Sequence, residues 1–252
     1  MAGDGAAGVL LVHGAGGSAE AHFGGLTARL GDRRRIVACA LPDEPGADPD
    51  AVVDGFAAAA GAAGLDSFAV CGYSLGAPLA VRLAVRHPGR VRALALCAPF
   101  ARADARMRLA VSVWRGLYEA GLTGLLAEQL ALTGLGPRFL ERHPLRLLRA
   151  ALALAPAPPA GTPAHLDLAE RIDVREDLAR LAVPALVVVT GGDPLVAPDR
   201  QRALAAAVPG AETAELDTGH LPFWEDPEGW AEVLAGFLER FPGPVPEETG
   251  VR

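Results

Sequence analysis

The stretch Gly72-Tyr73-Ser74-Leu75-Gly76 comes directly after an apolar run at 68–71 and before a helix-like segment at 77–85. A serine on a sharp turn between a buried strand and a helix has its hydroxyl exposed, and flanking glycines let the strand and the helix pack closely. The chain contains only four serines, which argues against a chance match. The pattern predicts that Ser74 is a nucleophile.

Segments that could supply partners for this serine stand in a characteristic order along the chain. A nucleophilic serine needs a general base, an acid that orients the base, and backbone donors for an oxyanion. In the strand–turn–helix arrangement the acid follows the serine and the histidine comes last. Asp193 follows an apolar, strand-like run, and His220 follows a shorter one. Upstream, an apolar run at 9–12 leads into the glycine-rich turn at 13–17, which exposes backbone N–H groups.

Taken together, these segments resemble the α/β-hydrolase family, in particular its small, lidded members, which include esterases, lactonases and C–C bond hydrolases. The resemblance covers nearly the whole chain. It rests on four motifs, which are His13-Gly14-Ala15-Gly16-Gly17, Gly72-Tyr73-Ser74-Leu75-Gly76, Gly192-Asp193-Pro194-Leu195-Val196, and Gly219-His220-Leu221-Pro222 followed by Glu225-Asp226-Pro227. It implies a three-layer α/β fold with a mostly parallel sheet and an inserted helical lid.

The expected architecture alternates strands and helices, which favours a parallel sheet covered on both faces. Members of the family usually have an extra hairpin before the first strand assigned here, and only residues 1–8 stand there, so we expect a sheet trimmed to about six strands. The predicted strands lie at 8–12, 35–40, 67–71, 92–97, 184–190 and 212–216. The predicted helices of the core lie at 19–30, 49–63, 75–87, 199–207 and 228–240.

The alternation breaks between residues 100 and 172, where no strand is evident. Short helices are predicted there at 106–118, 122–133 and 137–154. We interpret this insertion as a lid that excludes water and shapes the substrate pocket. The chain is accordingly divided into a first core part at 1–98, a helical lid at 99–177, a second core part at 178–241 and a loose tail at 242–252.

Three residues are assigned to the chemistry. We expect Ser74 Oγ to attack a carbonyl carbon, with His220 acting as general base and then as general acid. Asp193 is expected to fix the tautomer of His220 and to stabilise its cation. Asp217, which is close to His220 in sequence, and Asp104, which follows a different predicted strand, remain alternatives for the acid.

Further residues complete the expected site. The N–H groups of Leu75 and Ala15 are expected to form the oxyanion hole. His13 is expected to be structural rather than a base. The candidate walls of the substrate pocket are Tyr73, Trp114, Phe223 and Trp224.

Composition and charge exclude several other classes of function. The net charge of −7 argues against nucleic-acid binding, because phosphates need a basic protein face. The absence of lysine excludes Schiff-base catalysis, lysine-bound pyridoxal phosphate and a P-loop lysine. The cysteines fall in apolar runs and the remaining histidines show no ligand spacing, so we expect neither a metal nor a cofactor. These residues are Cys39, Cys71, Cys97, His22, His87, His143 and His165.

No apolar run is long enough to span a membrane, and the N-terminus lacks the pattern of a signal peptide. We therefore expect a cytoplasmic protein that acts on a small molecule. The oligomeric state is open.

Three functions remain from different classes. The first is hydrolysis of an ester, lactone or thioester of a small apolar molecule through a covalent acyl-enzyme. The second is a biosynthetic tailoring enzyme that uses the same side chains for elimination, cyclisation or acyl transfer, as a thioesterase does. The third is a ligand receptor without catalysis, because a fold alone does not determine function.

Overall fold

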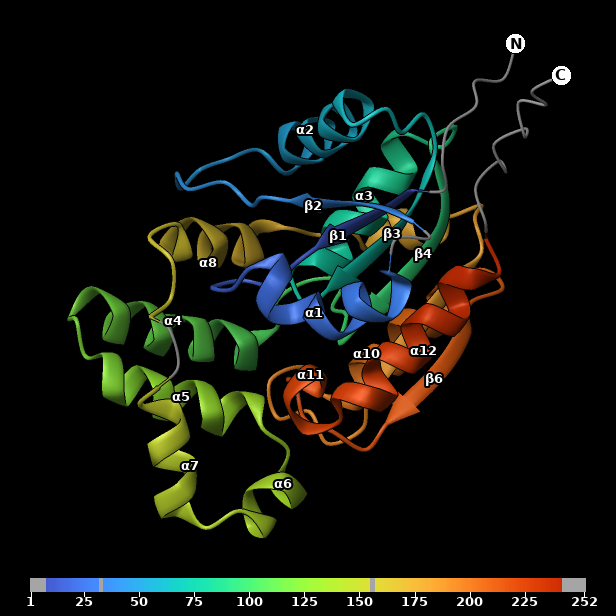
Figure 1. Ribbon diagram of the computed structural model, residues 1–252. Helices are drawn as coiled ribbons and strands as arrows, with labels where there is room; N and C mark the ends of the chain where they lie inside the picture. Colours follow the sequence, from blue (N-terminus) through green and yellow to red (C-terminus); the bar gives the residue numbers. More distant parts are fainter. Residues whose placement is uncertain (1–7, 32–33, 155–156, 242–252) are drawn as a thin grey trace, which may run out of the picture.

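A computed structural model describes residues 8–31, 34–154 and 157–241. At its centre is a six-stranded sheet in the order β2-β1-β3-β4-β5-β6, and every neighbouring pair of strands is parallel (Figure 1). The strands are β1 (Gly8–Val12), β2 (Arg35–Cys39), β3 (Phe68–Tyr73), β4 (Val91–Cys97), β5 (Ala185–Thr190) and β6 (Glu212–Leu216). The predicted fold class is confirmed. The largest difference from the predicted strands is at β3, which continues two residues further, to Tyr73.

Two expectations concern residues outside the described ranges. One is the missing hairpin before β1, which involves residues 1–7, and the other is the loose tail at 242–252. Within the part of the chain that is described, no helix is long and apolar enough to cross a membrane.

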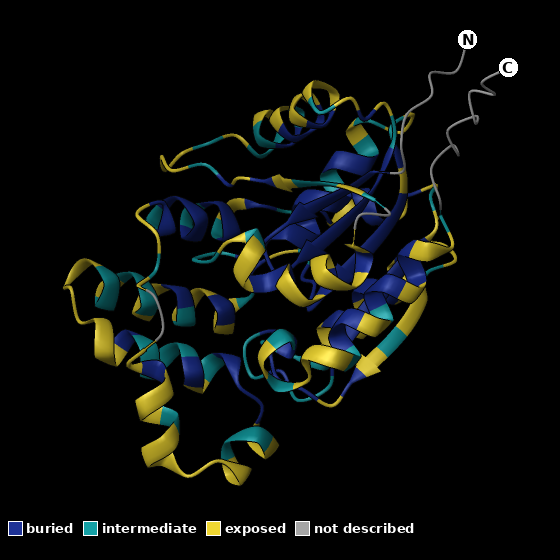
Figure 2. Ribbon diagram, viewed as in Figure 1, coloured by how far each residue is buried: buried dark blue, intermediate teal, exposed yellow. Residues whose placement is uncertain are grey.

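Helices cover both faces of the sheet and make three layers (Figure 1). One face is covered by α1 (Ala19–Leu30) and α12 (Pro227–Glu239), and the other mainly by α2 (Pro49–Ala62), α3 (Gly76–Arg86) and α10 (Pro198–Ala207). In β1, Leu10 and Val12 join one core cluster, whereas Val9 and Leu11 join the other. Successive strand residues point to opposite faces. Both faces are buried along nearly all of the four inner strands, whereas the edge strands β2 and β6 also carry exposed residues (Figure 2).

The helices begin where local chemistry predicts. Ser18 accepts a hydrogen bond from Ala21 N–H at the start of α1, and Asp226 accepts one from Gly229 N–H at the start of α12. Such caps satisfy N–H groups that have no partner in the first turn. Pro227 occupies the first turn of α12, where its missing N–H costs nothing.

The insertion between β4 and β5 carries helices on its described residues. They are α4 (Ala105–Glu119), α5 (Thr123–Gly134), α6 (Pro137–Arg142), α7 (Leu145–Leu152), α8 (Thr162–Arg171) and α9 (Arg175–Leu178). The helical stretch predicted at 137–154 is divided before Pro144, because a proline disfavours the helical conformation of the residue that precedes it. The last two helices were not predicted.

The packing of the insertion is uneven. Ala131, Leu135 and Leu152 form a small apolar cluster of their own among α5 and α7. In contrast, α8 contributes Leu168 and Ala169 to the main core. The assignment of residues 99–177 as a lid stays a prediction, and α8 packs as part of the central domain.

The turn between β3 and α3 requires glycine at two positions. A Cβ atom on Gly72 would overlap the carbonyl oxygen of Gly76, and one on Gly76 would overlap the carbonyl oxygen of Val12 in β1. Both obstacles are backbone atoms, so they cannot rotate away as a side chain could. The strand and the helix therefore meet closely, with Ser74 on the turn between them.

We expect Gly76→Ala to lower the free energy of unfolding by about 3 kcal/mol or more, because overpacking against backbone forces the strand and the helix apart. The matched control is Gly236→Ala in α12, where an added Cβ meets no atom within 4 Å. That control should raise the free energy of unfolding by about 0.5–1 kcal/mol through helix propensity. Urea unfolding of both variants measures the difference, and a Gly76→Ala protein as stable as the wild type would contradict the close packing.

Candidate active site

Ser74 has an unusual backbone conformation. Its φ angle is 52°, in the left-handed region that side chains other than glycine rarely adopt. Its N–H donates a 3.0 Å hydrogen bond to the carbonyl oxygen of Cys97 at the end of β4, which ties the strained turn to the sheet. Backbone strain of this kind concentrates at functional sites because the surrounding structure has to hold it in place.

Three side chains form a continuous chain of hydrogen bonds at the carboxyl ends of the strands. His220 Nε2 lies 2.8 Å from Ser74 Oγ, and His220 Nδ1 lies 2.7 Å from Asp193 Oδ2. All three residues are buried. In this geometry Nδ1–H donates to the carboxylate, which leaves Nε2 free to accept the proton of the serine hydroxyl.

Asp193 is held by four further donors. Its Oδ1 accepts hydrogen bonds from the N–H groups of Leu195 and Val196, both at 2.8 Å. Its Oδ2 accepts from Thr190 Oγ1 at 2.8 Å and from Gln201 Nε2 at 3.0 Å. Because every one of these partners is a donor, the carboxylate is fixed in one orientation toward His220.

The two alternative acids lie elsewhere. Asp217 is exposed and forms an ion pair with Arg138 at 2.6 Å. Asp104 caps α4, where its Oδ1 accepts a 2.9 Å hydrogen bond from Met107 N–H. Of the three candidates, the structure brings Asp193 into contact with His220.

The loop that carries His220 is fastened from two sides. The hydroxyl of Tyr73 donates a 2.7 Å hydrogen bond to the carbonyl oxygen of His220. Glu225 Oε1 accepts from Gly219 N–H at 2.9 Å and from Gly136 N–H at 3.0 Å. One carboxylate thus joins the histidine loop to the turn between α5 and α6, a role that the sequence motif around Glu225 did not reveal.

The loop at 13–17 lies directly over the serine. A Cβ atom on Gly14 would come 3.1 Å from Ser74 Cβ. Gly14 N–H donates to His22 Nδ1 at 3.2 Å, and Gly16 N–H donates to His165 Nδ1 at 3.1 Å. Within the described residues, no atom accepts a hydrogen bond from Ala15 N–H or Leu75 N–H.

Three histidines lie close together at this loop: His13 in the loop itself, His22 nine residues further on, and His165 from the distant helix α8. The ring centroid of His13 lies 6.1 Å from that of His22 and 5.8 Å from that of His165. Burial, together with the nearby His13 and His220, lowers the pKa of His22 from 6.5 to about 3. Burial likewise lowers the pKa of His165 to about 4, with His13 adding to the shift and Asp43 opposing it. Both rings are therefore neutral near neutral pH.

The possible metal ligands and the cysteines of the described residues complete the inventory of candidate site groups. No cluster of three or more histidine, cysteine or acidic side chains in the described part of the chain could hold a metal ion. The three cysteines are buried, and burial raises the pKa of each thiol, to about 12 for Cys39. A thiol with such a pKa is a poor nucleophile at neutral pH.

The four candidate wall residues occupy different environments. Tyr73 is buried in the core, and Phe223 packs edge-on against its ring with a distance of 5.2 Å between the ring centroids. The indole of Trp114, from α4, lies against Gly16, whose φ of 67° also favours glycine. Trp224 is 44% exposed.

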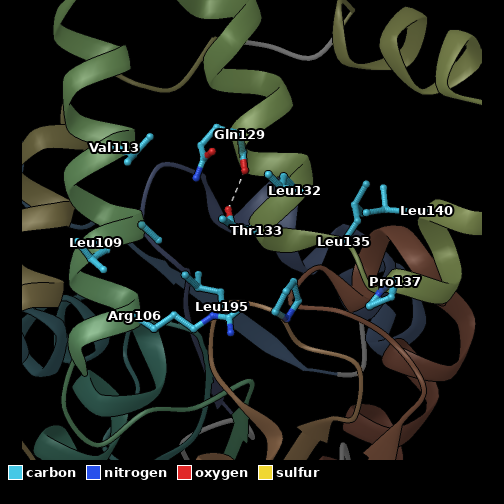
Figure 3. Close-up of a pocket in the computed structure, with 12 residues that line it drawn as sticks. Arg106, Leu109, Val113, Gln129, Leu132, Thr133, Leu135, Pro137, Leu140 and Leu195 are labelled. Carbon is cyan, nitrogen blue, oxygen red and sulfur yellow. Dashed lines mark hydrogen bonds between the residues drawn. The ribbon is translucent and has the colours of Figure 1, made fainter.

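A cleft of about 520 Å³ opens between the insertion and the loop that follows Asp193 (Figure 3). None of the four candidate wall residues lines it. Its lining is mostly apolar and comes from α4, α5 and α6 together with Pro194 and Leu195. The lining residues include Leu109, Val113, Leu132, Leu135 and Leu140, with Arg106, Gln129 and Thr133 as the polar groups.

Comparisons with known proteins agree with this architecture. The model of the family described as "Alpha/beta hydrolase family" matches residues 9–233. The pimeloyl-(acyl-carrier protein) methyl ester esterase of Neisseria meningitidis serogroup B (strain H44/76) is 32% identical over 92% of this chain and 92% of its own length. The pyrrolizixenacetamide deacetylase of Xenorhabdus hominickii is 28% identical over 92% and 90%. A thermophilic esterase from Thermogutta terrifontis superposes with a TM-score of 0.78 at 27% identity, covering 94% of this chain and 90% of its own.

The buried histidines predict how stability depends on pH. In the unfolded chain each titrates near 6.5, whereas in the folded protein His165 titrates near 4 and His22 near 3. Between these values the unfolded state binds more protons, so stability falls as pH is lowered from 6.5, by up to about 1.4 kcal/mol per pH unit for each histidine.

The test compares the free energy of unfolding of wild type and His165→Asn at pH 7, 6, 5 and 4.5. The asparagine side chain can still accept a hydrogen bond but does not titrate. The slope of the free energy of unfolding against pH should therefore be smaller in the variant, by the equivalent of about one bound proton. Identical slopes for the two proteins would show that His165 is not held neutral.

Proposed function

This hydrolase belongs to the alpha/beta hydrolase family, and we propose that it cleaves carboxylic esters through a covalent acyl-enzyme on Ser74. The observation that carries the proposal is the unbroken chain from Ser74 Oγ through His220 to Asp193, with contacts of 2.8 and 2.7 Å. The proposed mechanism uses only side chains and backbone groups of this chain.

In the acylation step, Ser74 Oγ attacks the ester carbonyl carbon while His220 Nε2 takes the hydroxyl proton. The tetrahedral intermediate carries a negative oxygen, and the unpaired N–H groups of Leu75 and Ala15 are the proposed donors to it. The intermediate collapses when the bond to the leaving alcohol breaks and His220 gives its proton to that oxygen. An acyl-Ser74 ester and a free alcohol result.

In the deacylation step, a water molecule enters the place that the alcohol has left and attacks the acyl-enzyme. His220 accepts a proton from the water as its oxygen attacks the acyl carbon, and then protonates Ser74 Oγ as the acid leaves. Asp193 keeps Nδ1 of His220 protonated in both steps and stabilises the imidazolium. The fixed geometry of the Asp193 carboxylate supports this assignment, as do the hydrogen bonds of Tyr73 and Glu225 to the loop of His220.

The lining of the cleft supports an apolar acyl or alcohol group in the substrate. Pro194 and Leu195, which line the cleft, follow Asp193 directly in sequence, whereas Ser74, His220 and Asp193 do not line it themselves. The names of two relatives describe cleavage of a methyl ester and removal of an acetyl group. We infer that small apolar esters, lactones and thioesters are the substrate class.

Removing the nucleophile should abolish turnover. We expect Ser74→Ala to lower kcat for p-nitrophenyl esters by a factor on the order of 10⁴–10⁶. The matched control is Ser112→Ala on the exposed surface of α4, which should keep wild-type kinetics. A fluorophosphonate should add its mass to wild type and to the control but not to Ser74→Ala, and a Ser74→Ala protein that still hydrolyses esters at the wild-type rate would rule out the mechanism.

The size of the cleft should limit the length of the acyl chain in the ester substrate. Each methylene buried contributes about 0.8 kcal/mol, so kcat/KM should rise about fourfold per added CH₂ until the cleft is full. Leu132→Trp narrows the cleft and should shift the optimum to shorter acyl chains. Leu147→Trp, at an exposed position of α7 that does not line the cleft, is the control and should leave the optimum unchanged. An unchanged optimum in Leu132→Trp would place the acyl chain elsewhere.

A further inference from the structure

Two histidines from distant parts of the chain hold the loop that covers Ser74. His22 comes from α1 and accepts a hydrogen bond from the N–H of Gly14, eight residues earlier in the chain. His165 comes from α8 and is 149 residues away from Gly16, its donor. Both rings are buried, with 8% and 3% of their surface exposed.

The contacts specify the chemical state of both rings. Nδ1 can accept a hydrogen bond from a backbone N–H only when it carries no proton, so the proton of each neutral ring is on Nε2. A doubly protonated ring would present a donor to Gly14 N–H or Gly16 N–H and would break the contact. Burial favours the neutral form at both positions.

The two anchored N–H groups flank a third that is free. Gly14 and Gly16 stand on either side of Ala15, whose N–H has no acceptor among the described residues. Trp114 presses against Gly16, and Tyr73 and Ser74 lie under Gly14. The peptides on both sides of Ala15 are thereby fixed in direction, and the direction of Ala15 N–H follows from theirs.

We propose that His22 and His165 are positioning residues that hold the oxyanion loop so that Ala15 N–H points at the oxygen of the transition state. The inference rests on the proposed function, because it concerns the same site. Neither histidine touches the reacting atoms; each acts through the backbone of the loop. Through His165 the insertion contributes to the proposed reaction geometry, because Leu168 and Ala169 anchor α8 in the main core.

Loss of a histidine contact to the loop should affect the transition state rather than substrate binding. An oxyanion donor acts when negative charge develops on the carbonyl oxygen, so loss of its direction lowers kcat more than it changes KM. If His165 only supported the fold, its substitution would lower the amount of active enzyme. A replacement that keeps the hydrogen-bond acceptor and one that removes it would then have the same effect.

The kinetic test uses three variants and p-nitrophenyl esters as substrates. His165→Leu removes the acceptor and should lower kcat by about 10- to 100-fold with KM within about threefold of wild type. His165→Asn places an amide oxygen near the former Nδ1 and should keep kcat within about threefold. His87→Leu, at the far end of α3 from Ser74, is the control for the same chemical change and should keep wild-type kinetics. A wild-type kcat in His165→Leu, or equal losses in the leucine and asparagine variants, would overturn the proposal.

A spectroscopic test needs no substrate. In ¹⁵N-labelled wild type at pH 7, the ring nitrogens of His22 and His165 should show the tautomer with a bare Nδ1 and a protonated Nε2. The amide proton of Gly16 should exchange faster in His165→Asn than in wild type, and faster still in His165→Leu where that variant folds. The opposite tautomer at His165 would refute the anchoring contact.

The two tests separate two kinds of failure. A wild-type enzyme that cleaves no ester while its histidines show the expected tautomers would refute the proposed function and leave the anchored loop in place. Active wild type with the opposite tautomers, or with unaffected His165→Leu kinetics, would refute the positioning role alone.

Discussion

The structure depends on one close backbone approach, at the turn between β3 and α3. Gly72 and Gly76 let the strand, the helix and the end of β1 come together at distances that exclude a Cβ atom. That approach places Ser74 in a left-handed conformation at the carboxyl edge of the sheet. In open parallel sheets ligands bind at this edge, because the loops that leave the strands converge there. The other parts of the proposed site are arranged around this serine.

Three loops meet at Ser74, and each is held by buried or part-buried polar contacts as well as by apolar packing. Thr190, Gln201 and two backbone N–H groups orient Asp193. Tyr73 and Glu225 fasten the loop of His220. Buried polar groups are costly unless paired, so the paired contacts around Asp193 and His220 favour one arrangement of these loops over others. Precise placement of the reacting groups matters because small displacements are expensive for catalysis.

The insertion contributes to the site in two different ways. Its helices α4, α5 and α6 supply most of the apolar lining of the cleft, the proposed site for the apolar part of the substrate. Its helix α8 packs into the main core and reaches the loop over Ser74 through His165. The turn between α5 and α6 is also joined to the His220 loop through Glu225. The insertion is thus joined to the proposed active site by hydrogen bonds as well as by packing.

The sequence by itself determined the sheet, the helices of the core and the identity of Ser74, Asp193 and His220 as candidates. These depend on local signals: apolar runs, capping residues and glycines at a sharp turn act between residues that are close along the chain. Only the tertiary structure decided that Asp193 rather than Asp217 meets His220, that Tyr73 lies behind the site, and that His22, His165 and Glu225 hold its loops. Those contacts join residues as far as 149 positions apart. The partners of His22, His165 and Glu225 are backbone N–H groups. Every residue except proline carries such a group, so no sequence pattern marks these contacts before the chain is folded.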